Sequence, residues 1–188
     1  MRRREWGALG FATLLLSGCG RYAEFRLPVK AEAYPEEKRW QWTAEANPQI
    51  ARGDQVDVLN PAVVEHGGEL WNFYSAFDGK TWHTALAKSA DGKTWTRVSG
   101  KVLSPDPATW EGNYIAANGD VVRVKDEWWM WYQAGPMGKT RIGLAKSKDG
   151  VKWVKHPEPV LDFGPRGAWD EISLGDADGY VGEDGWFY

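Results

Sequence analysis

The decapeptide LAKSADGKTW at residues 86–95 returns almost unchanged as LAKSKDGVKW at residues 144–153, an offset of 58 positions. The similarity extends beyond this stretch, because the same offset aligns identical residues on either side of it. Those identities include the pairs Asn60/Asn118, Val63/Val121, Trp71/Trp129, Tyr74/Tyr132 and Trp95/Trp153. A similarity that keeps one period over such a length indicates stacked copies of a single supersecondary unit.

Each unit is predicted to contain four short strands. Apolar and aromatic runs are separated by turn-forming residues in both copies: AVVEH, ELWNFYSA, WHTALAKS and TWTRV in the first, and DVVRV, EWWMWYQA, TRIGLAKS and VKWVK in the second. The pairs Asp91-Gly92 and Asp149-Gly150 lie between the third and fourth runs. An Asp-Gly pair between two strands predicts a hairpin with a type I′ turn, in which both central residues have positive φ.

The run EWWMWY at residues 127–132 carries apolar side chains on both faces of a strand. A four-stranded sheet covered on both faces by copies of itself is a propeller blade. We therefore predict an all-β fold, a β-propeller of four-stranded antiparallel blades at 57–115, 116–174 and, incomplete, 175–188. Because ring closure needs at least four blades, we expect these units to be the N-terminal part of a longer, five-bladed propeller.

The N-terminus has the pattern of an exported protein. Arg2, Arg3 and Arg4 precede a short apolar run at 7–16, which is typical of a signal peptide. The stretch LSGC at 16–19 resembles the lipobox of bacterial lipoproteins, and the single Cys of the chain lies there. We predict a signal peptide at 1–18, a lipidated Cys19 that begins a tether at 19–56, and anchoring to a bacterial outer membrane or cell surface. The alternative is an ordinary secretory signal that contains a cysteine.

Several classes of function are not indicated. The net charge is -3, and no basic stripe suggests nucleic acid as a partner. No set of His, Cys and carboxylate residues has the spacing of metal ligands, so no metal is expected. No phosphate-binding or dinucleotide-binding fingerprint is present either, so no cofactor is expected.

The element S-x-D-G-x-x-W, the aromatic strand before it and the PVL…WDE stretch after it resemble the five-bladed propeller glycoside hydrolases of families 43 and 32. The resemblance covers residues 57–188. It implies a carbohydrate substrate and carboxylates at the starts of the innermost strands. It also implies three roles, namely a base or nucleophile, an orienting Asp and an acidic Glu.

When the family pattern is compared with this sequence residue by residue, two positions differ from it. Asn60 in NPAV and Asn118 in NGDV stand where an Asp is expected, whereas Asp178 in DGYV keeps the carboxylate. Asp178 is therefore the first catalytic candidate. The candidates for its partner are Asp57, Asp120 and Glu111. The structural alternative for each is a carboxylate that caps a turn or lies on the rim.

Further residues are candidates for binding the substrate. Asn60 and Asn118 would contact sugar hydroxyls. His83 and Arg141 are equivalent in the repeat and would bind sugar or phosphate oxygens, unless they are ordinary surface polar groups. The remaining candidates are Trp110, Trp82 and Trp169 for stacking, and Asp170 and Glu171 for hydroxyls or for fixing the chain between blades.

The resemblance implies a glycoside hydrolase that acts on oligosaccharides or polysaccharides. Asn60 and Asn118 motivate an alternative, a carbohydrate-binding lipoprotein without catalysis. His83 and Arg141 motivate another, a phosphorolytic enzyme similar to family 130, which needs one acid and a cationic phosphate site.

Overall fold

The structure, a computed structural model, describes residues 43–47 and 49–188. The predicted signal peptide 1–18 and the lipidation candidate Cys19 lie outside the described residues. All eight strands belong to one compact unit, Glu45–Tyr188. No helix long and apolar enough to cross a membrane occurs in the part of the chain that is described.

The first blade is an antiparallel sheet of four strands in chain order. Its strands are β1 (Asp57–His66), β2 (Glu69–Phe77), β3 (Trp82–Ser89) and β4 (Thr96–Leu103). The second blade repeats this arrangement. Its strands are β5 (Ile115–Val124), β6 (Glu127–Gly135), β7 (Arg141–Ser147) and β8 (Trp153–Lys155).

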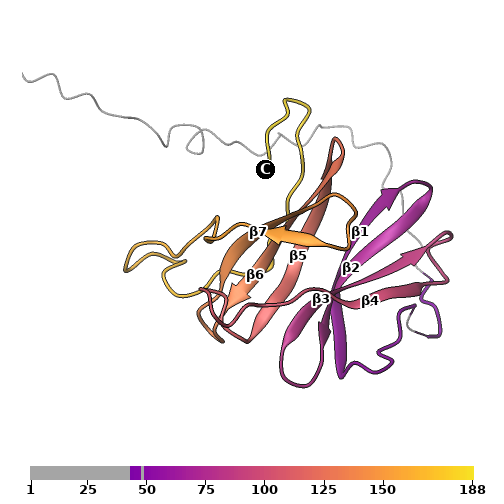
Figure 1. Ribbon diagram of the computed structural model, residues 1–188, viewed down its shortest axis with the longest axis horizontal. Coiled ribbons are helices and arrows are strands. Elements are labelled where there is room, and N and C mark those ends of the chain that lie inside the picture. The colour runs from indigo at the N-terminus through magenta and orange to yellow at the C-terminus, as the bar shows by residue number, and fades with distance from the viewer. Residues whose placement is uncertain (1–42, 48) are drawn as a thin grey trace, which may run out of the picture. The chain divides into compact units, whose positions relative to one another are not determined.

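The two blades stand side by side and are joined at one corner (Figure 1). There β3 pairs in parallel with β5, through Trp82 with Ile115 and His83 with Ala116. A third unit begins with a short hairpin at 180–188, in which Tyr180 and Tyr188 exchange two backbone hydrogen bonds of 3.0 Å. The predicted all-β fold, a partial propeller of four-stranded antiparallel blades, is confirmed.

The core lies between the blades. Trp71 and Phe73 project from β2 onto Trp128 of β6, with ring centroids 4.9 and 5.6 Å apart. Trp128, Met130 and Tyr132 all point toward the first blade and are buried. Each large side chain removed from water contributes about 2–3 kcal/mol, so this contact holds the two sheets together.

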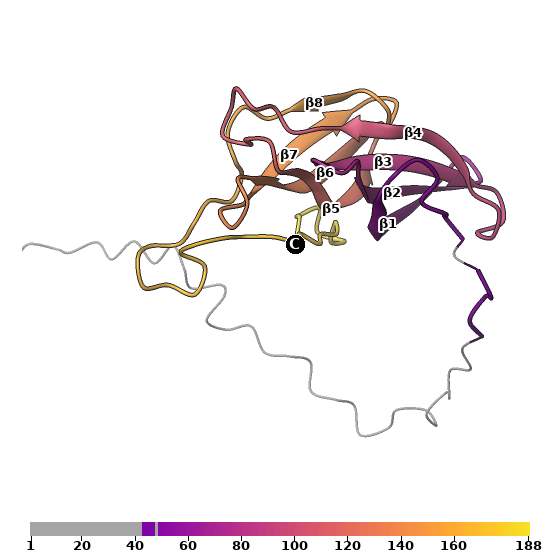
Figure 2. The same cartoon turned by 90° about the horizontal axis from the view of Figure 1, so that it is seen from below.

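The opposite face of β6 contacts the third unit. Trp129 stacks on Phe187 with ring centroids 4.9 Å apart, and Trp131 meets the same ring edge-on at 5.3 Å. Figure 2 shows the C-terminal segment lying below the sheet on this side. The predicted alternation along β6 is confirmed, because its two rows of aromatic side chains face two different neighbours.

The repeated decapeptide closes one hairpin in each blade, but its turn differs from the prediction. The loop spans residues 90–95, and only Gly92 has a positive φ, of 72°, so the turn is not type I′. The Asp91 carboxylate instead accepts the backbone N–H groups of Lys93 and Thr94 at 2.8 and 2.7 Å. These bonds lower the pKa of Asp91 to about 2.

The same contacts recur around Asp149 in the second blade. Its carboxylate accepts the N–H groups of Val151 and Lys152, each at 2.8 Å. In both loops the indole N–H of the closing Trp donates to the carbonyl of the Gly at 3.1 Å. Side-chain hydrogen bonds within the decapeptide thus fix the conformation of the hairpin loop.

Gly119 marks a close approach of two strands. A Cβ at this position would lie 2.0 Å from the carbonyl oxygen of Trp131. We predict that Gly119→Ala lowers the free energy of unfolding by about 2–4 kcal/mol, because β6 would have to move. Urea unfolding measures this change.

The matched control is Gly100→Ala, whose new methyl group would meet only the Gln55 side chain at 3.5 Å. Its unfolding free energy should change by less than about 0.5 kcal/mol. Equal losses in the two variants would contradict the role assigned to Gly119.

Candidate functional site

The innermost strand of each blade carries the same irregularity. The pairing register shifts between Leu59 and Ala62 in β1 and between Ala117 and Asp120 in β5. At these bulges the backbone of Asn60 and of Asn118 is left-handed, with φ of 50° and 49°. Asn adopts this conformation more readily than most residues, which explains an amide at both positions. Bulges of this kind re-aim side chains next to functional sites.

The third unit repeats the conformation at Asp176, where φ is 51°. Asp176 follows Asn118 by the repeat offset of 58, so it is the true counterpart of Asn60 and Asn118. The motif DGYV predicts Asp178 as the counterpart of Asn60 and Asn118. The structure gives this position to Asp176, two residues earlier, and Asp178 is the counterpart of Asp120. Sequence reasoning missed Asp176 because it matched a short motif rather than keeping the offset.

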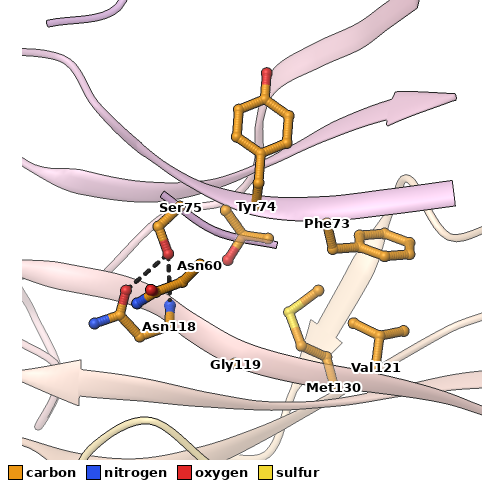
Figure 3. Close-up of a pocket in the computed structure, with 9 residues that line it drawn as sticks. Asn60, Phe73, Tyr74, Ser75, Asn118, Gly119, Val121 and Met130 are labelled. Carbon is orange, nitrogen blue, oxygen red and sulfur yellow. Dashed lines mark hydrogen bonds between the residues drawn. The ribbon is translucent and has the colours of Figure 1, made fainter. Parts of the chain in front are cut away.

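The two bulges and Asp176 lie close together. The Asn60 side-chain amide donates to the Asp176 carboxylate at an N···O distance of 3.4 Å, which links the first unit to the third. Asn60 and Asn118 line one narrow crevice together with Ser75 (Figure 3). The crevice itself is too narrow to hold a ligand.

Asn118 is engaged in joining the blades. Its side-chain oxygen accepts the Ser75 hydroxyl at 2.7 Å, and its amide donates to the Gln133 side-chain oxygen at 3.1 Å. Its backbone N–H also donates to Ser75, at 3.0 Å. The Gln133 side-chain amide in turn donates to the Thr140 hydroxyl at 2.8 Å. Both ends of the Asn118 amide are therefore used within the protein.

Asp120 and Asp178 form a carboxyl pair. Asp120 is half-buried, and its carboxylate accepts the N–H of Gly179 at 3.1 Å. Burial raises the pKa of Asp120, the charge and hydrogen bond of the neighbouring Asp178 raise it further, and the N–H groups of Gly179 and Val121 oppose this. Asp178 is exposed. Two of the four predicted catalytic carboxylates thus lie together.

Glu111 serves a different purpose. Its side chain is 2% exposed and lies between the blades. It accepts the Tyr132 hydroxyl at 2.5 Å, the Lys155 ammonium at 2.5 Å and the N–H of Asp106 at 2.7 Å. Burial raises the pKa of Tyr132, and its hydrogen bond to Glu111 adds to the effect. A carboxylate enclosed in this way has no access to a substrate.

Asp57 lies at the start of β1 and is exposed. Its carboxylate accepts the N–H of Val58, the next residue of the strand, at 2.9 Å. No described contact joins it to the pair of Asp120 and Asp178.

His83 and Arg141 fix the connection that leaves their own blade. His83 is buried, and its ring nitrogens lie 2.8 Å from the Ser104 hydroxyl and 3.0 Å from the Asp78 carboxylate. Burial lowers its pKa, which favours the neutral ring. The Arg141 guanidinium donates to Asp162, which is the repeat counterpart of Ser104, at 2.6 Å.

The remaining candidates lie in the connections between blades. Trp110 packs against the interblade core. The main-chain oxygen of Asp170 accepts the N–H of Gly164 at 3.1 Å, and the Glu171 carboxylate accepts the N–H of Gly167. These contacts fix the chain itself. Trp169 is 92% exposed and Trp82 stacks on Phe77 at 4.9 Å, so neither touches the carboxyl pair in the described structure.

Within residues 43–47 and 49–188, no group of three or more His, Cys, Asp or Glu side chains is arranged to hold a metal ion. The side chains at the converging strands carry carboxyl and amide groups, which can transfer protons and form hydrogen bonds.

Comparison with solved structures finds similar folds in several proteins described as glycoside hydrolases. One glycoside hydrolase superposes with a TM-score of 0.58 and 20% identity, over 68% of this chain and 44% of that one. A family 117 glycoside hydrolase from the marine bacterium Zobellia galactanivorans gives 0.61 and 17%, over 70% and 47%. A glycosyl hydrolase from Bacteroides ovatus gives 0.51 and 25%, over 61% and 34%.

The chain thus spans less than half the length of these structures. No protein-family model matches the sequence, and no curated protein sequence matches it. At these identities the likeness shows the fold alone, a partial β-propeller.

The raised pKa of Asp120 makes the stability of the protein depend on pH. In the unfolded chain an Asp has a pKa of about 3.9. Between that value and the raised folded value the folded chain holds the proton more tightly, so the contribution of Asp120 to stability falls as the pH rises. Asp120→Asn removes this titration, and its stability relative to wild type should be greater at about pH 7 than at about pH 3.

Urea unfolding at the two pH values measures the effect. Asp126→Asn, in the exposed turn between β5 and β6, is the matched control. A relative stability of Asp120→Asn that is the same at both pH values would contradict the raised pKa.

Proposed function

We propose that the protein is a glycoside hydrolase that cleaves glycosidic bonds of oligosaccharides or polysaccharides at the converging strand starts. The observation that carries this proposal is the contact between the Gly179 N–H and the Asp120 carboxylate, at 3.1 Å, which sets Asp178 beside Asp120. The left-handed residues Asn60, Asn118 and Asp176 lie nearby. Glycoside hydrolysis needs two carboxyl groups, one to protonate the leaving oxygen and one to act as base or nucleophile.

The environments of the two carboxyls suit different roles. Asp120 is half-buried and keeps its proton to higher pH, which suits a general acid. Asp178 is exposed and is suited to accept a proton from water or to hold the sugar in place. Asp176 adds a third carboxylate, at 3.4 Å from Asn60, that would accept hydrogen bonds from sugar hydroxyls.

More specifically, we propose that the protein is related to glycoside hydrolase families 43 and 32. This relationship is supported by the hydrogen-bonded S-x-D-G-x-x-W hairpin in each blade and by carboxylates at the starts of the innermost strands. Asn60 and Asn118 depart from the Asp that those families place at the first and second blades.

Binding without catalysis is the second candidate, and the two asparagines favour it. An amide neither transfers a proton at neutral pH nor forms a glycosyl ester, and Asn118 is already engaged by Ser75 and Gln133. A phosphorolytic reaction has less support, because His83 and Arg141 are held by side chains of their own blade.

Activity assays of the full-length protein separate these functions. The substrates are aryl arabinofuranosides, fructosides and mannosides, each with and without phosphate. We predict hydrolysis without phosphate and a fall in kcat of about a hundredfold or more in Asp178→Asn and Asp120→Asn. Loss of one carboxyl removes a proton transfer that substrate binding alone does not replace.

The control is again Asp126→Asn, which lies at the far end of β5 and should keep wild-type turnover. Glycan binding without product in any assay would reject the enzyme in favour of the binding protein. Turnover unchanged in Asp178→Asn would reject the residue assignment alone.

We also propose that the protein is exported and anchored through a lipid on Cys19 to a bacterial outer membrane or cell surface. The support is the sequence pattern of positive charge, apolar run and lipobox at 1–19. We predict that metabolic labelling with a fatty acid marks the wild type in the membrane fraction, because acyl chains partition into the bilayer. Cys19→Ala should lose both the label and the membrane association. Equal labelling of the two proteins would overturn the anchor.

A further inference from the structure

The segment between Leu174 and Gly179, which carries Asp178, is held at both of its ends. At the first end, the backbone N–H of Leu174 donates to the carbonyl of Thr140 at 2.8 Å. At the second end, the N–H of Gly179 donates to the Asp120 carboxylate at 3.1 Å. The place of Asp178 beside Asp120 therefore depends on how the first end is fixed.

Thr140 fixes that first end with its side chain as well as its backbone. It is buried, and its hydroxyl donates to the carbonyl of Leu174 at 2.7 Å. The Ser173 hydroxyl lies 2.8 Å from the Thr140 hydroxyl and accepts the backbone N–H of Thr140 at 3.2 Å. Thr140, the residue before β7, thus binds two successive residues of the incoming segment.

The direction of these hydrogen bonds is fixed by chemistry. A hydroxyl donates one hydrogen bond and accepts two, and a carbonyl only accepts. The Thr140 hydroxyl therefore donates to Leu174 and accepts from the Ser173 hydroxyl. It also accepts from the side-chain nitrogen of Gln133, at 2.8 Å. With its nitrogen turned to Thr140, Gln133 presents its oxygen to the Asn118 amide at 3.1 Å.

The same row of hydrogen bonds continues into the first blade. The side-chain oxygen of Asn118 accepts the hydroxyl of Ser75, which belongs to β2, at 2.7 Å (Figure 3). The donors, in order, are Ser75, Asn118, Gln133 and Thr140, and the last acceptor is the Leu174 carbonyl. One directed row of side chains thus links the first blade, the second blade and the start of the third unit.

The repeat shows what is particular to the second junction between units. Ser75 and Gln133 are counterparts, and so are Ala117 and Gly175. A Cβ at Gly175 would lie 2.9 Å from the side-chain atoms of Gln133. A larger side chain on the second strand is therefore combined with a glycine in the segment that it contacts. Gln133 both reaches Thr140 and passes close to the backbone just before the site carboxylates.

We propose that Gln133 and Thr140 are positioning residues for the carboxyl pair. They act through the segment that follows Leu174, which brings Asp178 beside Asp120. The catalytic part of this role rests on the proposed function, because a reaction that needs two carboxyls is slowed when one of them is displaced. The placement of the two carboxyls can be measured without any substrate.

Thr140→Val keeps the shape of the side chain and removes its hydroxyl, so the Leu174 carbonyl and the Gln133 amide lose a partner. NMR titration of the Asp120 carboxyl group in the full-length protein measures the result. Burial and then the neighbouring Asp178 raise the pKa of Asp120, so its pKa should fall toward the ordinary value when the segment moves away. Thr140→Ser, which keeps the hydroxyl, should titrate like wild type.

Turnover gives the second measurement. We expect kcat to fall about tenfold or more in Thr140→Val, with a smaller change in KM, because carboxyl placement is lost rather than sugar binding. The matched control is Ser147→Ala, at the other end of β7. It removes a buried hydroxyl that accepts the N–H of Gly150 at 2.9 Å, and should change neither kcat nor the pKa of Asp120.

Gln133→Met, which keeps the length of the side chain without its hydrogen bonds, repeats the test should Thr140→Val fail to fold. An Asp120 pKa that neither variant lowers, or that Ser147→Ala lowers equally, would overturn the proposal. So would an unchanged kcat in both variants of an active enzyme. A wild-type protein without turnover would reject the proposed function instead, and the titration would still decide whether Thr140 places the carboxyls.

Discussion

The fold depends on one repeated contact, in which the aromatic side chains of one sheet cover the facing sheet of the next unit. Trp71 and Phe73 can leave water only where Trp128 and its neighbours provide a surface, and neither sheet is covered without the other. Stability in such a chain is close to a sum over neighbouring units. The contact also sets the direction of the innermost strands, and so brings Asn60, Asn118 and Asp176 to one place.

The site arises from backbone irregularity rather than from a special loop. Each innermost strand breaks its register once, at a residue whose φ is near 50°. Such a conformation costs energy for most residues. At Asn118, hydrogen bonds to Ser75 and Gln133 hold the side chain in place. Beside these irregularities Asp178 lies next to Asp120, whose carboxylate accepts the N–H of Gly179.

The regular part of this structure could be predicted from the sequence, and the local chemistry could not. A fixed offset and strict alternation predict the strands of both blades and the two faces of β6, because those features repeat. The burial of Glu111 could not be predicted from the sequence. Its burial depends on Tyr132 and Lys155, which come from two later strands, and no local pattern signals that encounter. His83 was misjudged for the same reason, since Ser104 and Asp78 reach it from opposite sides. The repeat offset predicts Asp176 as the counterpart of Asn118, but the short motif DGYV pointed to Asp178 instead.

The Glu111 contact has a consequence for how such proteins diversify. The carboxylate belongs to one unit, while the hydroxyl and the ammonium that satisfy it belong to the next. When units are duplicated or exchanged with a junction between Glu111 and Tyr132, the incoming unit must therefore supply an equivalent hydroxyl and cation for the buried carboxylate. A connection that is exchanged together with the blade that follows it keeps this contact intact. The unit that preserves the contact therefore begins before the first strand of the blade.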